Sequence, residues 1–84
     1  MAKRFVIRIM TGNSIVIDQP CSKDLTKEEA IAKAERLWDK IPLEEKMEGD
    51  SYACVLRAEL DDDFDNYDEA VEKAEEIWLK DMEG

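Results

Sequence analysis

The chain has 84 residues, the length of one small domain, and we expect residues 1–84 to form a single unit. It carries 12 basic and 22 acidic residues, which gives a formal net charge of -10. Such a charge repels nucleic-acid phosphates and anionic membranes, so direct binding to either is not expected. The charge instead favours basic protein surfaces or cations as partners.

Cysteine usage and hydropathy indicate a cytoplasmic protein. Cys21 and Cys54 are too few for a disulfide framework and too isolated for a zinc site, so we expect both to be reduced thiols with structural roles. No small-residue cleavage site follows the first apolar segment, so a signal peptide is not expected. No apolar run reaches the ~20 residues of a membrane helix.

The first elements predicted are two strands. Residues 5–10 are mainly apolar, and Arg4 and Arg8 share the side opposite the apolar alternation, as in a half-buried strand. Residues 11–14 read Thr-Gly-Asn-Ser, which is a turn signal, and residues 15–17 are again apolar and β-branched. A β-hairpin is therefore expected.

A capped helix should follow. Thr26 is a good N-cap, and Glu29 stands three residues later, where it completes a capping box. Pro42 closes the helix, and residues 43–47 can add a short extra turn. The apolar positions of the helix form one stripe, made of Ala30, Ile31, Ala34, Leu37, Trp38 and Ile41.

An internal repeat dominates the second half of the chain. Residues 30–40 reappear as residues 70–80, with six of the eleven positions identical, including the tryptophan. After a third strand over residues 52–60, the repeat predicts a second amphipathic helix beginning near Tyr67. The expected fold is α+β, in the order β-β-α-β-α. A right-handed crossover gives a three-stranded antiparallel sheet, in the order 2-1-3, with both helices on one face. Both tryptophans are then core residues.

The acidic segment between the third strand and the second helix suggests a calcium loop. Its spacing places possible ligands at Asp61, Asp63, Asp65, Glu69 and Glu72. The sixth position of the loop is Asn66 where an EF-hand has glycine, and a strand precedes the loop where an EF-hand has a helix. The alternative is a solvated acidic loop in which Asp65 or Asn66 caps the second helix.

Two surfaces are candidates for partner binding. Arg4, Arg8 and Arg57 are expected together on the outer face of the sheet, where they can hold a carboxylate or phosphate of a partner. The alternative is an open face that charge keeps soluble.

The second surface is the acidic side of the repeated helices, which includes Glu72, Glu75 and Glu76. Carboxylates at i and i+4 lie ~5–6 Å apart on a helix, close to the phosphate repeat of a nucleic acid strand, so such a side can imitate a polyanion. The alternative is an ordinary solvated helix surface.

Catalysis has little support in the sequence. The chain has no histidine, and no Gly-rich phosphate loop or nucleophile elbow is present. Neither cysteine has an evident activating partner. We therefore expect no enzymatic activity and no cofactor, calcium excepted.

Part of the chain resembles a group of short acidic bacterial proteins of unknown function. The resemblance covers the capped helix from Leu25 to Trp38, the segment Leu43 to Lys46, and the strand Ala53 to Leu56. That group recurs in gut anaerobes, often on mobile genetic elements. The resemblance implies a mobile-element context, with an accessory or counter-defence role.

These observations predict a small non-enzymatic protein-interaction module. The alternative is a mobile-element inhibitor, of the anti-CRISPR or anti-restriction type, that mimics nucleic acid and occupies a basic nucleic-acid-binding protein. Calcium binding is a third, independent hypothesis. Unpaired strand edges and a partly apolar sheet face are also compatible with a homodimer.

Overall fold

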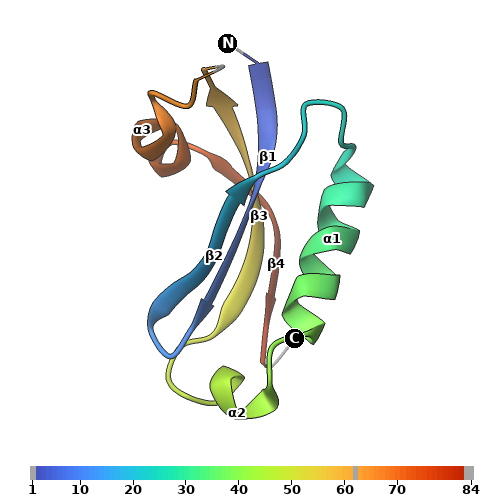
Figure 1. The fold of residues 1–84 in the computed structure, drawn as a ribbon, viewed down its shortest axis with the longest axis vertical. Helices are drawn as coiled ribbons and strands as arrows, with labels where there is room; N and C mark the ends of the chain where they lie inside the picture. The colour runs from blue at the N-terminus through green and yellow to red at the C-terminus, as the bar shows by residue number, and fades with distance from the viewer. Residues whose placement is uncertain (1, 62, 83–84) are drawn as a thin grey trace.

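A computed structural model shows an α+β fold built on a four-stranded antiparallel sheet, in the order β2-β1-β3-β4 (Figure 1). It describes residues 2–61 and 63–82. The strands are β1 (Ala2–Thr11), β2 (Ser14–Pro20), β3 (Tyr52–Leu60) and β4 (Glu75–Asp81). The helices are α1 (Lys27–Asp39), α2 (Leu43–Lys46) and α3 (Tyr67–Glu72). The α+β class and the order of the first three strands are confirmed, and the short extra turn expected over residues 43–47 is the helix α2, but β4 was not predicted.

The predicted hairpin is formed by β1 and β2. Gly12 and Asn13 both have left-handed backbone angles, with φ of 55° and 67°, as the two central residues of a type I′ turn require. The Asn13 side chain also reaches across the fold, since its Oδ1 accepts a hydrogen bond from the Asp50 N–H at 3.1 Å. The hairpin turn is therefore tied to the turn that precedes β3.

The capping box of α1 is confirmed. Thr26 Oγ1 accepts from the Glu29 N–H, and Glu29 Oε1 accepts from the Thr26 N–H, both at 3.2 Å. The predicted stripe faces the sheet, because its three innermost side chains, Ala30, Ala34 and Trp38, are buried. The two small alanines allow the helix to approach the strands closely.

The sheet is covered on both faces, not on one. The first hydrophobic cluster joins α1 to Ile7, Ile9 and Val55, while the second joins α3 to Val6 and Leu56. Figure 1 shows α1 and α3 on opposite sides of the strands. The prediction that both helices share one face is wrong. In β3 the four consecutive residues 53–56 are all buried, as expected of a central strand packed on both faces.

The repeated helix is also wrong beyond Glu72, because residues 75–81 form the edge strand β4. In the second copy Val71 and Ile77 replace Ile31 and Leu37, and the leucine-to-isoleucine change at 77 favours strand over helix. Glu76 replaces an arginine, so a continued helix would set it against Glu72 at i and i+4, where like charges repel. As a strand, the same segment pairs with β3 from Tyr52 to Arg57 and becomes the outer strand of the sheet on that side.

Candidate functional site

The sheet face opposite α1 is only partly covered. The α3 helix has six residues and packs over one end of this face, against Val6, Leu56 and Leu60. In Figure 1 it lies beside the end of the sheet where the chain begins. One turn and a half of helix spans only ~9 Å, so it cannot cover the length of the strands.

Beyond α3, the same face presents apolar side chains to water. Met10 lies directly opposite both Ile15 and Tyr52, and Leu79 lies opposite Cys54, so these residues share the face that holds the second cluster. Ile15 is 49% exposed and Leu79 51% exposed. We call the surface of Met10, Ile15, Tyr52 and Leu79 the open half-face.

A polar cluster separates the open half-face from α3. Arg8 Nη2 donates to Asp18 Oδ2 at 2.9 Å, and the Tyr67 hydroxyl of α3 donates to Asp18 Oδ1. Burial and this hydrogen bond to a carboxylate both raise the pKa of Tyr67, so its phenol stays protonated. The cluster ties α3 to β1 and β2. Arg8 therefore has an internal partner in Asp18.

The structure separates the three arginines that were predicted to lie together. Arg4 and Arg8 are on the α3 face, and the Arg4 guanidinium lies 5.0 Å from the centre of the Phe64 ring. Arg57 lies opposite Phe5, which packs in the α1 cluster, so Arg57 belongs to the other face. The predicted single surface of Arg4, Arg8 and Arg57 is wrong because β1 and β3 pair in a register that places Arg57 beside Phe5.

Next to the open half-face, the thiol of Cys54 is buried, with 3% of the residue exposed. Burial, the largest cause, and the nearby charge of Glu76 raise its pKa from the ordinary 9.0 to about 11. Cys21 is also buried and free, and burial raises its pKa as well. Neither thiol has the lowered pKa of an activated nucleophile.

The raised pKa of Cys54 predicts a loss of stability in alkali. Above pH 9.0 the unfolded state loses the thiol proton, whereas the folded state keeps it until about pH 11. The stabilisation is therefore complete below pH 9.0 and is lost as the pH rises towards 11. Urea unfolding between pH 8 and 11 should show a falling free energy of unfolding, with a shallower fall for Cys54→Ala. An identical pH slope in the two proteins would contradict this assignment.

The acidic residues of the suggested calcium loop make separate contacts and do not converge on one site. The Asp61 N–H donates to Asn66 Oδ1 at 2.9 Å, and Glu69 forms an ion pair with Lys73 at 2.9 Å. Asp63, Asp65 and Glu72 are exposed. Within residues 2–61 and 63–82, no three cysteine, aspartate or glutamate side chains are grouped so that they could hold a metal ion. The arrangement gives the calcium hypothesis no support, and calcium binding stays a prediction.

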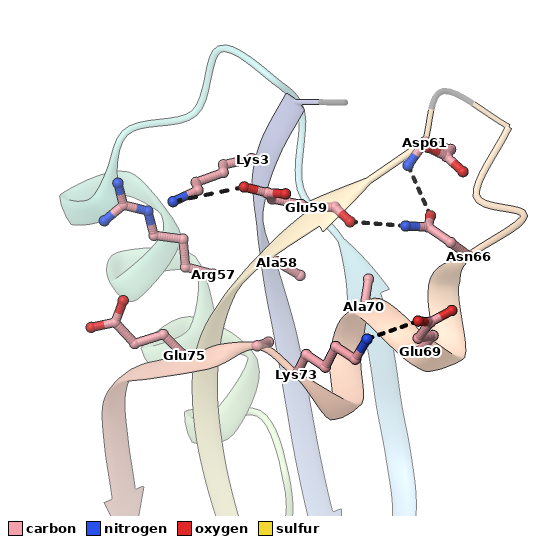
Figure 2. A pocket seen from close by; sticks show the side chains of 11 residues that line it. Lys3, Arg57, Ala58, Glu59, Asp61, Asn66, Glu69, Ala70, Lys73 and Glu75 are labelled. Atoms are coloured by element: carbon pink, nitrogen blue, oxygen red, sulfur yellow. Dashed lines mark hydrogen bonds and ion pairs between the residues drawn. The ribbon is translucent and has the colours of Figure 1, made fainter.

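A first hollow, of about 600 Å³, lies beside residues 58–59 of β3 and the first residue of β4 (Figure 2). Pairing between β3 and β4 starts at Arg57 and Glu75, so this part of β3 has no partner strand on that side. Cations and anions alternate around it, and Lys3 lies 4.0 Å from Glu59. Figure 2 shows Arg57 and Glu75 directed away from α3, so they do not converge on a common point with the Glu69–Lys73 pair. The mixed charges leave this hollow without a preference for one kind of ion.

The three glutamates proposed for nucleic-acid mimicry are not on one helix. Glu72 ends α3, whereas Glu75 and Glu76 lie in β4 and alternate across the strand. The i, i+4 spacing that was expected to imitate phosphates therefore does not exist for this trio.

A second hollow, of about 560 Å³, borders the open half-face. It is formed by the turn before β3 and by the end of β4, and it shares Tyr52 and Leu79 with the open half-face. The other lining residues that matter here are Asp50, Ser51, Glu76, Asp81 and Met82. Of these, sequence reasoning singled out only Glu76. The apolar run from Ile77 to Leu79, which contains the strand-favouring residues Ile77 and Trp78, was the available signal, but the helical repeat was followed instead.

Comparisons of the chain with protein-family models, with curated proteins and with solved structures find no match. The resemblance to short acidic bacterial proteins thus stays a prediction. Among the described residues, no helix is long and apolar enough to cross a membrane.

Proposed function

We propose that this chain is a small, non-enzymatic protein-interaction module that binds a protein partner through the open half-face. The observation that carries the proposal is the exposure of Ile15 and Leu79, at 49% and 51%, on a sheet face whose other half is closed by α3. Clustered apolar side chains left in water on a folded domain are typical of an interaction site. Tyr52 adds an aromatic ring, of the kind enriched at the centre of interfaces.

Two further features support a binding role over catalysis. The sequence has no histidine, the commonest general base. The Arg8–Asp18–Tyr67 cluster fixes its charged groups on one another, so it acts as a rigid border. A rigid surface loses little conformational entropy on binding.

Nucleic-acid mimicry by a cytoplasmic, mobile-element inhibitor is the alternative proposal. The net charge of -10 favours it, because a basic nucleic-acid-binding protein would attract such a molecule. This interaction would weaken steeply with salt, whereas an apolar interface on the open half-face would not.

Partner capture with matched leucine variants tests the proposal. The full-length tagged chain is incubated with nuclease-treated lysate of a gut anaerobe, at low and high salt, and captured proteins are identified by mass spectrometry. Leu79→Ser should reduce capture about tenfold, because an interface loses a buried apolar anchor worth more than 1 kcal/mol. Leu43→Ser should leave capture unchanged, because Leu43 is 61% exposed but lies on α2, whose Lys46 contacts Trp38 of the α1 cluster, and is not part of the open half-face.

The outcomes separate the two proposals. A salt-stable partner that Leu79→Ser loses supports the open half-face. Equal capture by the parent chain and Leu79→Ser overturns it. A nucleic-acid enzyme that is captured equally by both and released by salt supports mimicry instead.

A further inference from the structure

We infer that two copies of the chain pair along the outer edges of their β4 strands, so that their sheets join into one sheet across a two-fold axis. This inference goes beyond the proposed function and does not rest on it. In the sheet order β2-β1-β3-β4, β4 is an outer strand, and within the described chain its far edge has no neighbouring strand. Such an edge carries backbone N–H and C=O groups that a further strand can bind.

The middle of this edge is apolar on both faces of the sheet. Ile77 and Trp78 are half-buried and pack against the α1 cluster, whereas Leu79 is 51% exposed on the opposite face. A strand added at this edge would cover all three side chains further. The other outer strand, β2, is less suited, because it ends in Pro20, which has no N–H to donate.

The direction of the β3 backbone follows from the pairing of β1. The Phe5 carbonyl accepts from the Cys21 N–H, beyond the end of β2, at 2.7 Å, so Phe5 directs its backbone groups away from β3. Its register partner on β3, Arg57, therefore directs its own groups away from β1 and towards β4. Val55, two residues earlier on β3, does the same, because the direction alternates along a strand.

Two residues of β4 consequently direct their N–H and C=O groups to the open edge. Glu75 and Trp78 lie opposite the two β3 residues just named, so they bond inwards, and Glu76 and Leu79, the next residue after each, point outwards. Ile77 is the extra residue of a β-bulge, so the outward residues stand three positions apart. A regular strand repeats every second residue and does not fit this spacing, whereas a second copy has the same bulge and fits it.

This spacing sets the register between the two copies. Glu76 exchanges backbone hydrogen bonds with Leu79 of the second copy, and the two-fold axis repeats the pair. Ile77 then lies opposite Trp78 of the second copy, on the α1 face of the joined sheet. Pairs of an aromatic and a β-branched side chain stabilise antiparallel strands.

The charged residues of β4 are self-complementary in the same register. Glu75 lies opposite Lys80 of the second copy, and no two carboxylates of the paired strands lie directly opposite each other. Both side chains are on the α1 face, since their neighbours on β3 are Arg57 and Ala53. Neither side chain forms an ion pair within the described residues. Opposite charges that face each other across two strands favour this register over its alternatives.

The dimer is expected to be weak. A strand of seven residues gives far fewer contacts than the about 20–30 residues a side of a standard interface. The net charge of -10 on each copy also opposes association at long range, although physiological salt screens this repulsion beyond ~8 Å. We therefore expect dimers at high protein concentration.

Sedimentation equilibrium of the full-length chain at physiological salt tests the inference, from about 10 µM to about 1 mM, because small interfaces give weak complexes. The parent chain should convert from monomer to dimer over this range. Lys80→Glu sets two glutamates against each other in both cross-strand pairs and should weaken the dimer at least about tenfold. Lys27→Glu makes the same change of charge at the exposed start of α1 and should leave the dimer unchanged.

A mixture of complementary variants identifies the register. Glu75→Lys alone sets two lysines against each other and should also weaken the dimer at least about tenfold. Mixing Glu75→Lys with Lys80→Glu should restore dimerisation, because every lysine of the heterodimer then faces a glutamate. A variant that failed to fold would not be rescued in this way, and circular dichroism of each variant alone verifies its fold.

Several results would overturn the inference. These are a monomer at every concentration, equal weakening by Lys80→Glu and Lys27→Glu, or no heterodimer in the mixture. Loss of the dimer in Ile15→Ser would also overturn it, because Ile15 lies on β2, at the other side of the sheet. A monomer leaves the proposed function standing, since Lys80 lies on the face opposite the open half-face. A dimer with capture unaffected by Leu43→Ser and Leu79→Ser would overturn the proposed function alone.

Discussion

Replacement of Trp38 by alanine is expected to lower the free energy of unfolding by about 3–5 kcal/mol, because a large buried aromatic side chain would leave a cavity. Trp38 is 3% exposed and packs in the cluster that joins α1 to the sheet. The Lys46 ammonium of α2 lies 4.7 Å from the centre of its ring, so the same side chain also anchors α2. A loss of this size is a large share of the ~5–15 kcal/mol that stabilise a typical domain.

Trp78→Ala is the matched comparison, because the two tryptophans occupy equivalent positions of the repeat. Trp78 is only half-buried and lies on the edge strand β4, opposite Val55. Its removal should cost about 1–2 kcal/mol, well below the cost of Trp38→Ala, since a partly exposed site leaves a smaller cavity. Urea unfolding followed by far-ultraviolet circular dichroism measures both. Equal losses would mean that the two copies are equivalent in structure and would contradict the assignment of β4.

Local signals in the sequence were sufficient for most of the fold. Thr26 and Glu29 define the start of α1 through hydrogen bonds between near neighbours, so the capping box is visible without tertiary information. The Gly12–Asn13 pair defines the hairpin for the same reason, because only a few residues adopt left-handed backbone angles readily. The bounds of β3 were also predicted correctly, from alternation over residues 52–60.

The error at β4 arose where a tertiary contact overrides a local pattern. Residues 70–80 carry the apolar spacing of α1, but a helix there would leave β3 unpaired along one edge. Pairing with β3 gives each residue of the segment a neighbour from a distant part of the chain, which a local pattern does not reveal. The run of buried residues 53–56 was the best indication of β4. A strand that is buried on both faces is typically an interior strand, with another strand paired along each of its edges.

The surface of the candidate site also depends on the pairing of β4 with β3. The open half-face exists because β4 adds Leu79 to the sheet, and because α3 is too short to cover the face it occupies. With residues 70–80 assigned to a helix, Leu79 would not lie beside Tyr52, and the second hollow would not form. The prediction that the three arginines share one face was wrong for a related reason, because the pairing register of β1 and β3 decides which face each arginine occupies.

Asn66→Ala is expected to lower the free energy of unfolding by about 1–2 kcal/mol, because the Glu59 carbonyl of β3 and the part-buried N–H of Asp61 each lose a hydrogen bond. Ahead of the start of β4, residues 58–60 of β3 have no partner strand on that side, and the Asn66 amide takes the place of one (Figure 2). Its Nδ2 donates to the Glu59 carbonyl at 3.1 Å, and its Oδ1 accepts from the Asp61 N–H at 2.9 Å. Although Asn66 is the N-cap residue of α3, its side chain makes no capping hydrogen bond.

Asp65→Ala provides the neighbouring control. If an acidic or amide side chain capped α3, as the sequence suggested, Asp65 and Asn66 would be interchangeable candidates. Asp65 is exposed, so its replacement should change the free energy of unfolding by no more than about 0.5 kcal/mol. Asn66→Asp should lie between the parent chain and Asn66→Ala, because a carboxylate can still accept from the Asp61 N–H but cannot donate to the Glu59 carbonyl. It also adds charge to an acidic loop.

Amide hydrogen exchange locates the effect at the strand edge. In the parent chain the Asp61 N–H should be protected, and in Asn66→Ala its exchange should accelerate more than that of amides at the start of α3. Preferential loss of protection in α3 would instead identify Asn66 as a helix cap. The side-chain amide occupies the edge of β3 ahead of the start of β4, which disfavours the addition of a foreign strand there.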